Sequence, residues 1–401
     1  MVQSKKNAGI VKYKFIYTVL ILLVYLLGKS LPLYGVDISA YIHRNVEAED
    51  LLMQTISGDI YQYSVFALGI SPYMVSSIIV QIISTCRSAE SRARISPKKM
   101  NRLCLALTLI VAVFQAIVRV QELQFTDMGN MLLLTKIVAV AEMIAGVMII
   151  LWLSERNKKY GIGGQTALIF VNIIDGIGTT LKGHEIKSLI LPLIVSAIVM
   201  IIMVIMENAE KRIPVQRISI HNIYADKNYM AIKLNPIGVM PAMFSTAFFM
   251  VPQLLISGLS LLFTENETIA WWQENMALSN PLGIAVYIVI LYCLTIGFSR
   301  VFINPGEITE QFLKSGDSIL NLHAGRDTKR YLSREIGRIS FLSATVMSVC
   351  LGVPMILQLE GGIDSSLIML PSSIMMLTGI WCNLYREVVA IKDLEAYKPF
   401  I

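Results

Sequence analysis

The chain is divided into ten apolar runs of bilayer length, and its charged residues are confined to the stretches between them. Of its 401 residues, 55% are hydrophobic and 15% are charged, whereas a soluble domain carries about 25% charged residues. A transmembrane helix needs about 20 predominantly apolar residues. The sequence therefore predicts an all-α integral membrane protein with ten transmembrane helices, over residues 15–34, 65–84, 103–121, 131–153, 165–182, 188–206, 237–263, 281–303, 339–358 and 366–391.

The basic residues indicate how these helices are oriented. Of the 34 Lys and Arg residues, 28 lie in the N-terminal segment, the even-numbered loops and the C-terminal segment, whereas Asp and Glu divide almost evenly between the two sides. Cytoplasmic loops carry an excess of Lys and Arg. We therefore expect both termini to be cytoplasmic. The net charge of +6 reflects this distribution and is not a sign of nucleic-acid binding.

A short pattern occurs twice, as GISPYMVSS at 69–77 and as GVMPAMFST at 238–246. Each copy opens a long apolar run, and the two copies lie in different halves of the chain. Gly/Pro interruptions at matching positions of two membrane halves point to an internal duplication with a site at its interface. The pattern predicts a central passage lined near Ile70, Met74, Met240 and Met243.

Two of the predicted cytoplasmic loops are large, at 207–236 and 304–338. Alternating apolar residues at 215–224 and 229–234 predict a β-hairpin in the first loop. In the second, Asn304, Pro305 and Gly316 suit the start and end of a short helix, and a basic stretch follows. Together the loops indicate a docking surface for a cytoplasmic partner. The alternative is that their charge only reflects membrane orientation.

Residue patterns for catalysis or metal binding are lacking in the sequence. The five cysteines include no CxxC pair, and neither they nor the four histidines have the spacing of metal ligands. The glycine-rich GIGG at 161–164 does not follow a strand, so it indicates a tight start to the fifth helix and not a nucleotide site. Glu142, the one acid deep in a run, is either a proton-relay group or an interhelical contact, and the latter is favoured. We expect neither enzyme activity nor a cofactor nor a metal.

Five ordered motifs resemble the SecY protein-translocation channel family across essentially the whole chain. The similar stretches are ALGISPYMVSSIIVQII (67–83), KYGIGGQTALIFVNII (159–174), ENAEKRIPVQ (207–216), IKLNPIGVMPAMF (232–244), and INPGEITEQFLKSGD with the following TKRYLSREIGRIS. The resemblance implies two pseudo-symmetric five-helix halves, 1–184 and 185–401, with a small cytoplasmic β-hairpin. Such a channel narrows to a hydrophobic waist and opens sideways between spans 2/3 and 7/8.

The resemblance also assigns roles to residues of this sequence. It implies a pore ring of Ile70, Met74, Ile169, Ile173, Met240, Met243 and Met369. It implies a plug at about 50–62, with Leu51, Leu52, Met53, Ile56 and Ile60. It implies a lateral gate that includes Ser76, Ile79, Gln81, Ser245 and Phe248. It implies motor docking by Lys211, Arg212, Arg217, His323, Arg326, Lys329 and Arg330.

Departures from the family pattern indicate a branch within it. The last large loop reads ILNLHAGRDT at 319–328, where the family reads close to IPGIRPG. His323 therefore occupies the position of a family arginine important for the motor, and Arg326 is the alternative replacement. The predicted plug is more polar than usual, and the chain stops soon after the tenth run. These departures resemble the accessory SecY of some Gram-positive bacteria.

The resemblance implies a pore for unfolded, signal-peptide-bearing proteins, in the accessory branch serine-rich glycosylated adhesins, in the bacterial cell membrane. The expected partners are a SecA-like motor ATPase, SecE/SecG-like small membrane subunits and membrane lipid. One alternative is a housekeeping SecY for general secretion and membrane insertion. Another is a secondary transporter for a small solute, which would need polar groups near each Gly-x-x-Pro; the sequence offers Ser76, Ser77, Ser245 and Thr246 there.

Overall fold

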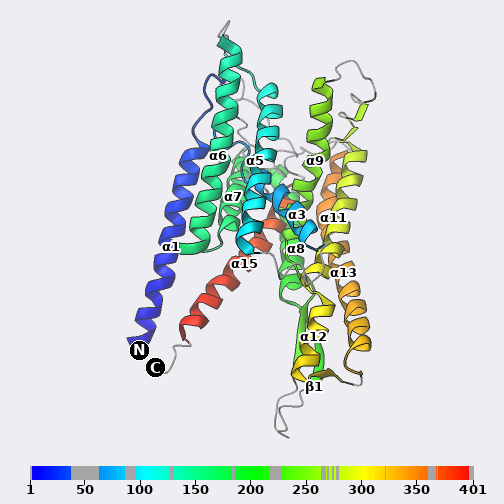
Figure 1. Ribbon diagram of the computed structural model, residues 1–401. Coiled ribbons are helices and arrows are strands. Elements are labelled where there is room, and N and C mark those ends of the chain that lie inside the picture. Colours follow the sequence, from blue (N-terminus) through cyan, green and yellow to red (C-terminus); the bar gives the residue numbers. More distant parts are fainter. Residues whose placement is uncertain are drawn as a thin grey trace.

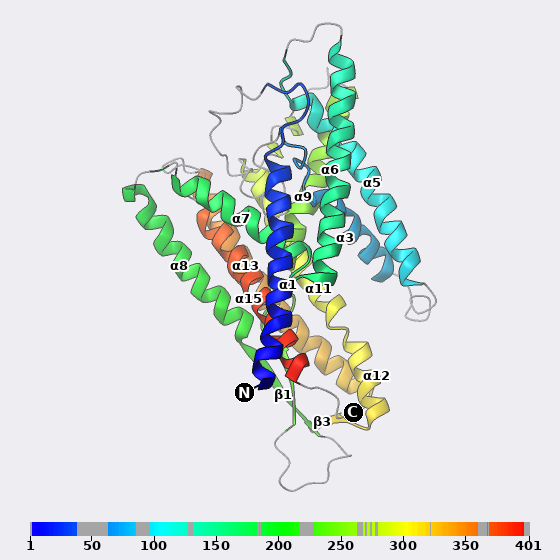
Figure 2. The same cartoon turned by 90° about the vertical axis from the view of Figure 1, so that its left-hand side faces the viewer.

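In the computed structural model, long helices stand side by side, and a small sheet with one short helix projects from one end of the bundle (Figure 1). Helix α1 begins and α15 ends at this same end (Figures 1 and 2). The structure describes residues 2–37, 63–85, 96–126, 131–182, 184, 186–216, 228–262, 268, 271–272, 275–276, 280–320, 322–359, 367 and 369–396.

Each of the ten apolar runs forms a helix. The first five runs correspond to α1 (Val2–Lys29), α3 (Ser71–Thr85), α5 (Pro97–Glu122), α6 (Leu132–Tyr160) and α7 (Gln165–Lys182). The last five correspond to α8 (Ile186–Asn208), α9 (Met240–Leu262), α11 (Pro281–Phe302), α13 (Arg326–Leu359) and α15 (Leu370–Ala396). The short helix α12 (Pro305–Ser315) precedes α13.

By length and composition, seven helices among the described residues could cross a membrane, namely α1, α5, α6, α8, α11, α13 and α15. Their outward side chains are apolar as well. On α8, for example, Ile194, Ile198 and Ile201 are each more than half exposed. In water such an exterior would be unfavourable, whereas lipid tails are as apolar as these side chains. The fold is therefore that of a multi-pass helical membrane protein.

Both copies of the repeated pattern form the same local structure, a glycine turn that starts a helix. Gly69 and Gly238 have φ angles of 54° and 69°, a left-handed conformation that favours glycine. The helices α3 and α9 start two residues after these glycines, and Pro72 and Pro241 are in their first turns. Proline is well suited to that position because its missing N–H would have no helical partner.

The two large loops fold into one body. Strand β1 (Glu210–Gln216) pairs antiparallel with β2 (Tyr229–Lys233), and its other edge pairs with β3 (Ser318–Ile319) from the second loop. The predicted hairpin is confirmed in part. Strand β2 falls as expected, whereas β1 begins at Glu210, before the predicted first strand, whose residues 217–224 lie outside the described residues. The sequence prediction missed β3. We call this unit, with α12 and the part of α13 before residue 339, the docking body.

An apolar cluster holds the docking body together. Ile213 of β1, Ile232 of β2 and Ile319 of β3 pack against Leu332 and Ile336 of α13. The sequence prediction ended the second loop at 338, but helix α13 starts at Arg326 because its first turns have this sheet to pack against. One continuous helix therefore connects the docking body to the ninth apolar run.

The two helices that begin with the repeated pattern lie in the middle of the bundle. Helix α3 packs on α5, α9 packs on α11, and α3 and α9 contact each other. Helix α15 packs extensively on α8 and also on α7, α1 and α13. Segments from the first and second halves of the chain thus meet where α3 and α5 contact α9 and where α15 contacts α7 and α1.

Candidate functional site

Five of the seven predicted ring residues lie in one buried apolar cluster, which we call the waist cluster. Ile70 lies in the turn before α3 and Met74 on α3; α7 contributes Ile169 and Ile173, and α9 contributes Met243. Each is at most 3% exposed. The cluster therefore draws apolar side chains from both halves of the chain, and the starts of α3 and α9 position three of them.

The other two predicted ring residues are not brought to this cluster. Met240, the first residue of α9, is 40% exposed. Met369 is buried in a separate cluster with Phe249, Ile284, Tyr287 and Met355.

Helix α15 instead contributes Met375, Met376 and Ile380 to the waist cluster. The sequence prediction missed these three residues, although residue 376 is nearer to the middle of the tenth apolar run than residue 369 is.

The predicted lateral-gate residues lie on the contacting helices α3 and α9. Ser76 is buried, and its Oγ donates to the Pro72 carbonyl at 2.8 Å. Ser245 is also buried, and its Oγ donates to the Ala242 carbonyl at 2.8 Å. Ile79 packs against the waist cluster, and Phe248 is exposed. Gln81 is on α3, and its side chain is outside the described part of the structure.

Several predicted residues lie outside the described residues altogether. They are the plug residues Leu51, Leu52, Met53, Ile56 and Ile60, together with Arg217 of the docking set. The remaining docking residues Lys211, Arg212, His323, Arg326, Lys329 and Arg330 are all on the docking body.

Most basic side chains of the docking body are exposed. His323, Arg326, Lys329 and Arg330 are exposed at the start of α13 and just before it. Arg212 on β1 is 62% exposed, pairs with Glu210 at 3.0 Å and lies 4.7 Å from the centre of the Tyr229 ring. These positive groups present a surface to which an acidic partner could bind.

Lys211 differs, because it ties the sheet to α13. Its ammonium group donates to the buried carboxylate of Glu335, and Arg338 donates to the other oxygen at 2.9 Å. These groups lie before the ninth apolar run. The hydrogen bond from Lys211 and the positive charges lower the pKa of the Glu335 carboxyl below its usual value. Lys211 is thus a structural contact of the docking body.

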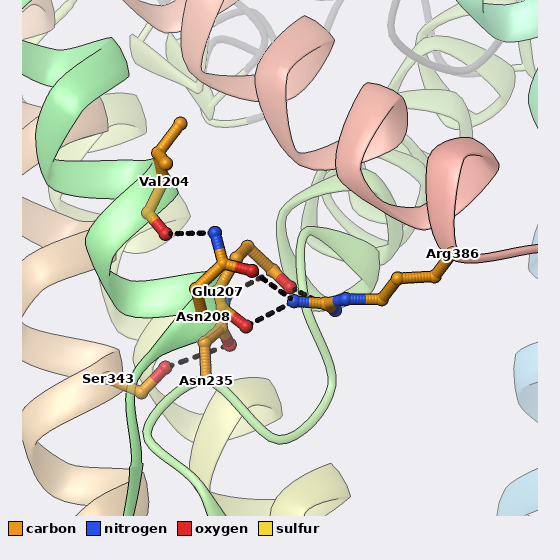
Figure 3. Close-up of polar contacts among 6 residues, drawn as sticks. All are labelled: Val204, Glu207, Asn208, Asn235, Ser343 and Arg386. Carbon is orange, nitrogen blue, oxygen red and sulfur yellow. Dashed lines mark hydrogen bonds and ion pairs between the residues drawn. The ribbon is translucent and has the colours of Figure 1, made fainter. Parts of the chain in front are cut away.

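A polar network around the buried Glu207 carboxylate lies beside the docking body, where the sheet meets the helix bundle (Figure 3). We call it the root network, because it lies where α8 leads into β1 and where β2 leads into α9. Its members are Glu207, Asn208, Asn235, Ser343 and Arg386. The Glu207 carboxylate is 1% exposed, and it accepts from Arg386 Nη1 at 2.9 Å and from Asn235 Nδ2 at 3.0 Å.

Two further hydrogen bonds belong to the root network. Arg386 Nη2 also donates to the main-chain oxygen of Glu207, and Ser343 Oγ donates to Asn235 Oδ1 at 3.1 Å. Sequence reasoning missed the network. One signal could have pointed to it, because Glu207 directly follows an apolar run and Arg386 lies inside one, and charges at such positions need partners.

Residues considered for other chemistry have structural contacts. The Glu142 carboxylate accepts from the Tyr34 main-chain N–H at 2.9 Å. Its contact is thus with the segment that follows α1, whereas the sequence predicts a contact with another helix. Lys29, at the end of α1, pairs with Asp175 of α7 at 2.6 Å. Among the described residues, no group of three His, Cys, Asp or Glu is placed to hold a metal ion.

The fold and this buried cluster define a class: a multi-pass helical membrane protein with an apolar core drawn from both halves of the chain. The SecY family model matches residues 64–385. The chain therefore belongs to the SecY family. Members of this family are transport proteins and not enzymes.

Curated relatives match over almost their whole length. The chain is 27% identical to the accessory Sec system protein translocase subunit SecY2 of Leuconostoc gelidum subsp. gasicomitatum, covering 98% of each chain. It is 29% identical to the SecY2 of Streptococcus agalactiae serotype Ia, covering 97% of this chain and 96% of the relative. The solved structure of a protein-conducting channel has the same fold, with a TM-score of 0.66 and 16% identity over 96% of this chain and 93% of that one.

Proposed function

We propose that this protein is the pore-forming subunit of an accessory Sec translocase, and that it conducts unfolded secretory proteins across the bacterial cell membrane. One observation carries the proposal, namely that predicted ring residues from both chain halves share one waist cluster. The likeness of the full chain to curated SecY2 proteins supports the accessory branch. The cargo in this proposal is serine-rich glycosylated adhesins.

In this proposal ten spans form two pseudo-symmetric halves, 1–184 and 185–401, with both termini in the cytoplasm. The matching glycine turns before α3 and α9 support the duplication. The positions of the two chain ends beside the docking body support the shared side (Figures 1 and 2). The plug of this proposal is residues 50–62, which lie outside the described residues.

The mechanism follows from the apolar waist. A narrow ring of Ile and Met side chains excludes water and ions, since hydrophobic constrictions close by dewetting. A signal helix that binds between α3 and α9 adds apolar contacts only when these helices separate. Such differential binding is what shifts a closed channel toward its open state. Methionine suits a ring that closes around varied chains, because its side chain is flexible.

Energy for transport comes from outside the channel in this proposal. A SecA-like ATPase binds the exposed basic side chains of the docking body, and SecE/SecG-like subunits complete the complex in the membrane. His323 and Arg326 are both exposed, so either can replace the usual family arginine.

The transporter alternative is less well supported by the same helices. The hydroxyls of Ser76, Ser77, Ser245 and Thr246 all donate to carbonyls of their own helices. A solute site would instead direct such groups toward a ligand. These side chains therefore act as helix-packing groups in the proposed channel.

Ion conductance in planar bilayers tests the waist. Ile70→Gly and Ile173→Gly each remove a side chain from the cluster, so we expect a higher resting conductance than in the wild type. Ile198→Gly is the matched control, because Ile198 is exposed on the outside of α8. Wild-type conductance in both waist variants would contradict the proposed ring.

A further inference from the structure

The middle of α15, residues 379–387, contacts both halves of the chain, with a different helix face toward each. Trp381, Leu384 and Glu387 are spaced three residues apart, so they lie on one side of the helix. Gly379, Asn383 and Arg386 are spaced by four and three residues and form a second side. The first set contacts the segment around the start of α7, and the second contacts the root network and the start of α9.

The first side packs on α7 and on the GIGG loop at 161–164. Trp381 stacks on Phe170 of α7, with ring centroids 5.8 Å apart. The Glu387 carboxylate accepts from the Gly163 main-chain N–H at 3.1 Å. Leu384 lies so close to Gly163 that a β-carbon there would be 2.2 Å from its methyl group.

Buried hydrogen bonds hold the GIGG loop that receives this contact in place. Asn157 is fully buried, and its Nδ2 donates to the carbonyls of Ile162 and Gly164, each at 2.9 Å. Its Oδ1 accepts from Thr18 Oγ1 of α1 at 2.9 Å, and Thr18 Oγ1 accepts from the Ile162 N–H at 2.8 Å. Three buried hydrogen bonds therefore join the loop to α6 and α1, and a fourth joins α1 to α6, so the loop is a firm part of the first half of the chain.

The second side of α15 packs as closely against the second half of the chain as the first side packs against Gly163. A β-carbon on Gly379 would lie 2.2 Å from Val239, and one on Gly238 would lie 3.3 Å from the Asn383 side chain. Arg386 binds the Glu207 carboxylate in the root network (Figure 3). Gly238 and Val239 directly precede α9, and Glu207 lies near the end of α8, three residues before β1. This side of α15 therefore contacts the segments that lead into α9 and into the sheet of the docking body.

We propose that residues 379–387 of α15 form a clamp that sets the position of the docking body relative to the first half of the chain. Arg386 and Glu387 are its positioning residues, since neighbouring side chains bind opposite partners. The clamp transmits a displacement of the docking body to the contact between α3 and α9, because the first half, α15 and the start of α9 are held in one continuous packing. The functional role of this coupling rests on the proposed function, whereas the contacts that form the clamp do not.

Distance measurements between spin labels on the full-length protein in nanodiscs test the clamp. The labels replace exposed lysines, Lys98→Cys on α5 and Lys314→Cys on α12, in a protein without its native cysteines. The double variant Leu384→Ala with Glu387→Ala removes both contacts of the first side with Gly163, and Arg386→Gln weakens the second side. We expect each to replace one narrow distance peak by a broad distribution.

Matched variants separate positioning from general destabilisation. Leu384→Met with Glu387→Gln keeps a side chain against Gly163 and an oxygen for its N–H, so the narrow peak should be retained. Tyr385→Ala with Lys392→Gln changes two exposed residues of the same helix and should also retain it. The thermal unfolding midpoint of each variant is measured in parallel.

Two outcomes would overturn the clamp: a narrow peak in both clamp variants, or broadening that occurs equally in the Tyr385 and Lys392 control. Neither outcome depends on protein transport, so the proposed function could still hold. Conversely, unchanged ion conductance in the waist variants would contradict the proposed pore ring, while these distances would still show whether the clamp exists.

Discussion

Single residues without side chains decide how closely α15 approaches its neighbours. Gly163 has a φ of 78°, and Leu384 occupies the space that its β-carbon would need. The glycine therefore serves two purposes, a left-handed turn and a close contact. The GIGG pattern in the sequence predicts the tight turn but not the contact with a helix more than 200 residues away.

Gly163→Ala should destabilise the protein by about 1–3 kcal/mol, because a non-glycine residue in this conformation is strained. Adding Leu384→Ala should recover part of the loss by opening space, so the two changes will not be additive. Thermal unfolding in detergent measures both variants. Additive losses would mean that Gly163 and Leu384 do not contact each other.

Met376 should contribute to the waist more than Met369 does. Both side chains are fully buried, but only Met376 lies in the waist cluster. We expect Met376→Asp to raise resting ion conductance clearly above that of Met369→Asp, since a charge in an apolar constriction admits water. Equal conductance of these two matched variants would contradict the assignment of Met376.

At the scale of elements, β3 and the start of α13 form because segments distant in the sequence pack against them. Strand β3 has only two residues, and no sequence pattern marks it. It forms because the edge of β1 and the apolar cluster of the docking body are already in place. In the same way, α13 extends to Arg326 because the sheet covers its apolar side.

The Lys211–Glu335 contact should make the stability of the docking body depend on pH. The folded state lowers the pKa of Glu335, so this contribution is complete above the unfolded pKa of about 4.5. It should be lost as the pH falls through the lower, folded-state value. The difference in unfolding midpoint between the wild type and Glu335→Gln, measured from neutral pH downward, should therefore shrink. A difference that stays constant would contradict this.

At the scale of the whole molecule, one end of the bundle combines both chain ends with the docking body (Figure 2). Its exposed basic groups come from two loops that are far apart in the sequence. Their common surface exists only because β1 pairs with both β2 and β3. A motor bound there would contact both loops at once.

Arg212→Glu combined with Arg330→Glu should weaken binding of the SecA-like ATPase by about tenfold or more, equivalent to at least about 1.4 kcal/mol. Both side chains are exposed, so their wild-type contribution should also decrease with added salt. Lys12→Glu with Lys392→Glu is the control for total charge. Equal affinities of the two double variants would contradict motor docking at this surface.

The sequence by itself determined the membrane class, the ten helices, the two helix-starting turns and the family resemblance. These features depend on local composition and order, because a bilayer-length apolar run has few alternatives to a helix. It also identified five residues of the waist cluster: the repeated pattern indicated Ile70, Met74 and Met243, and the family resemblance implied Ile169 and Ile173.

Only the tertiary structure decided which side chains meet across the chain. It placed Met376 and not Met369 in the waist cluster, joined Glu207 to Arg386, and set α15 between the two halves. These contacts depend on how long helices pack, and one helical position turns a side chain by about 100°. A periodic apolar run therefore predicts that a helix is buried but not which partner each of its faces contacts.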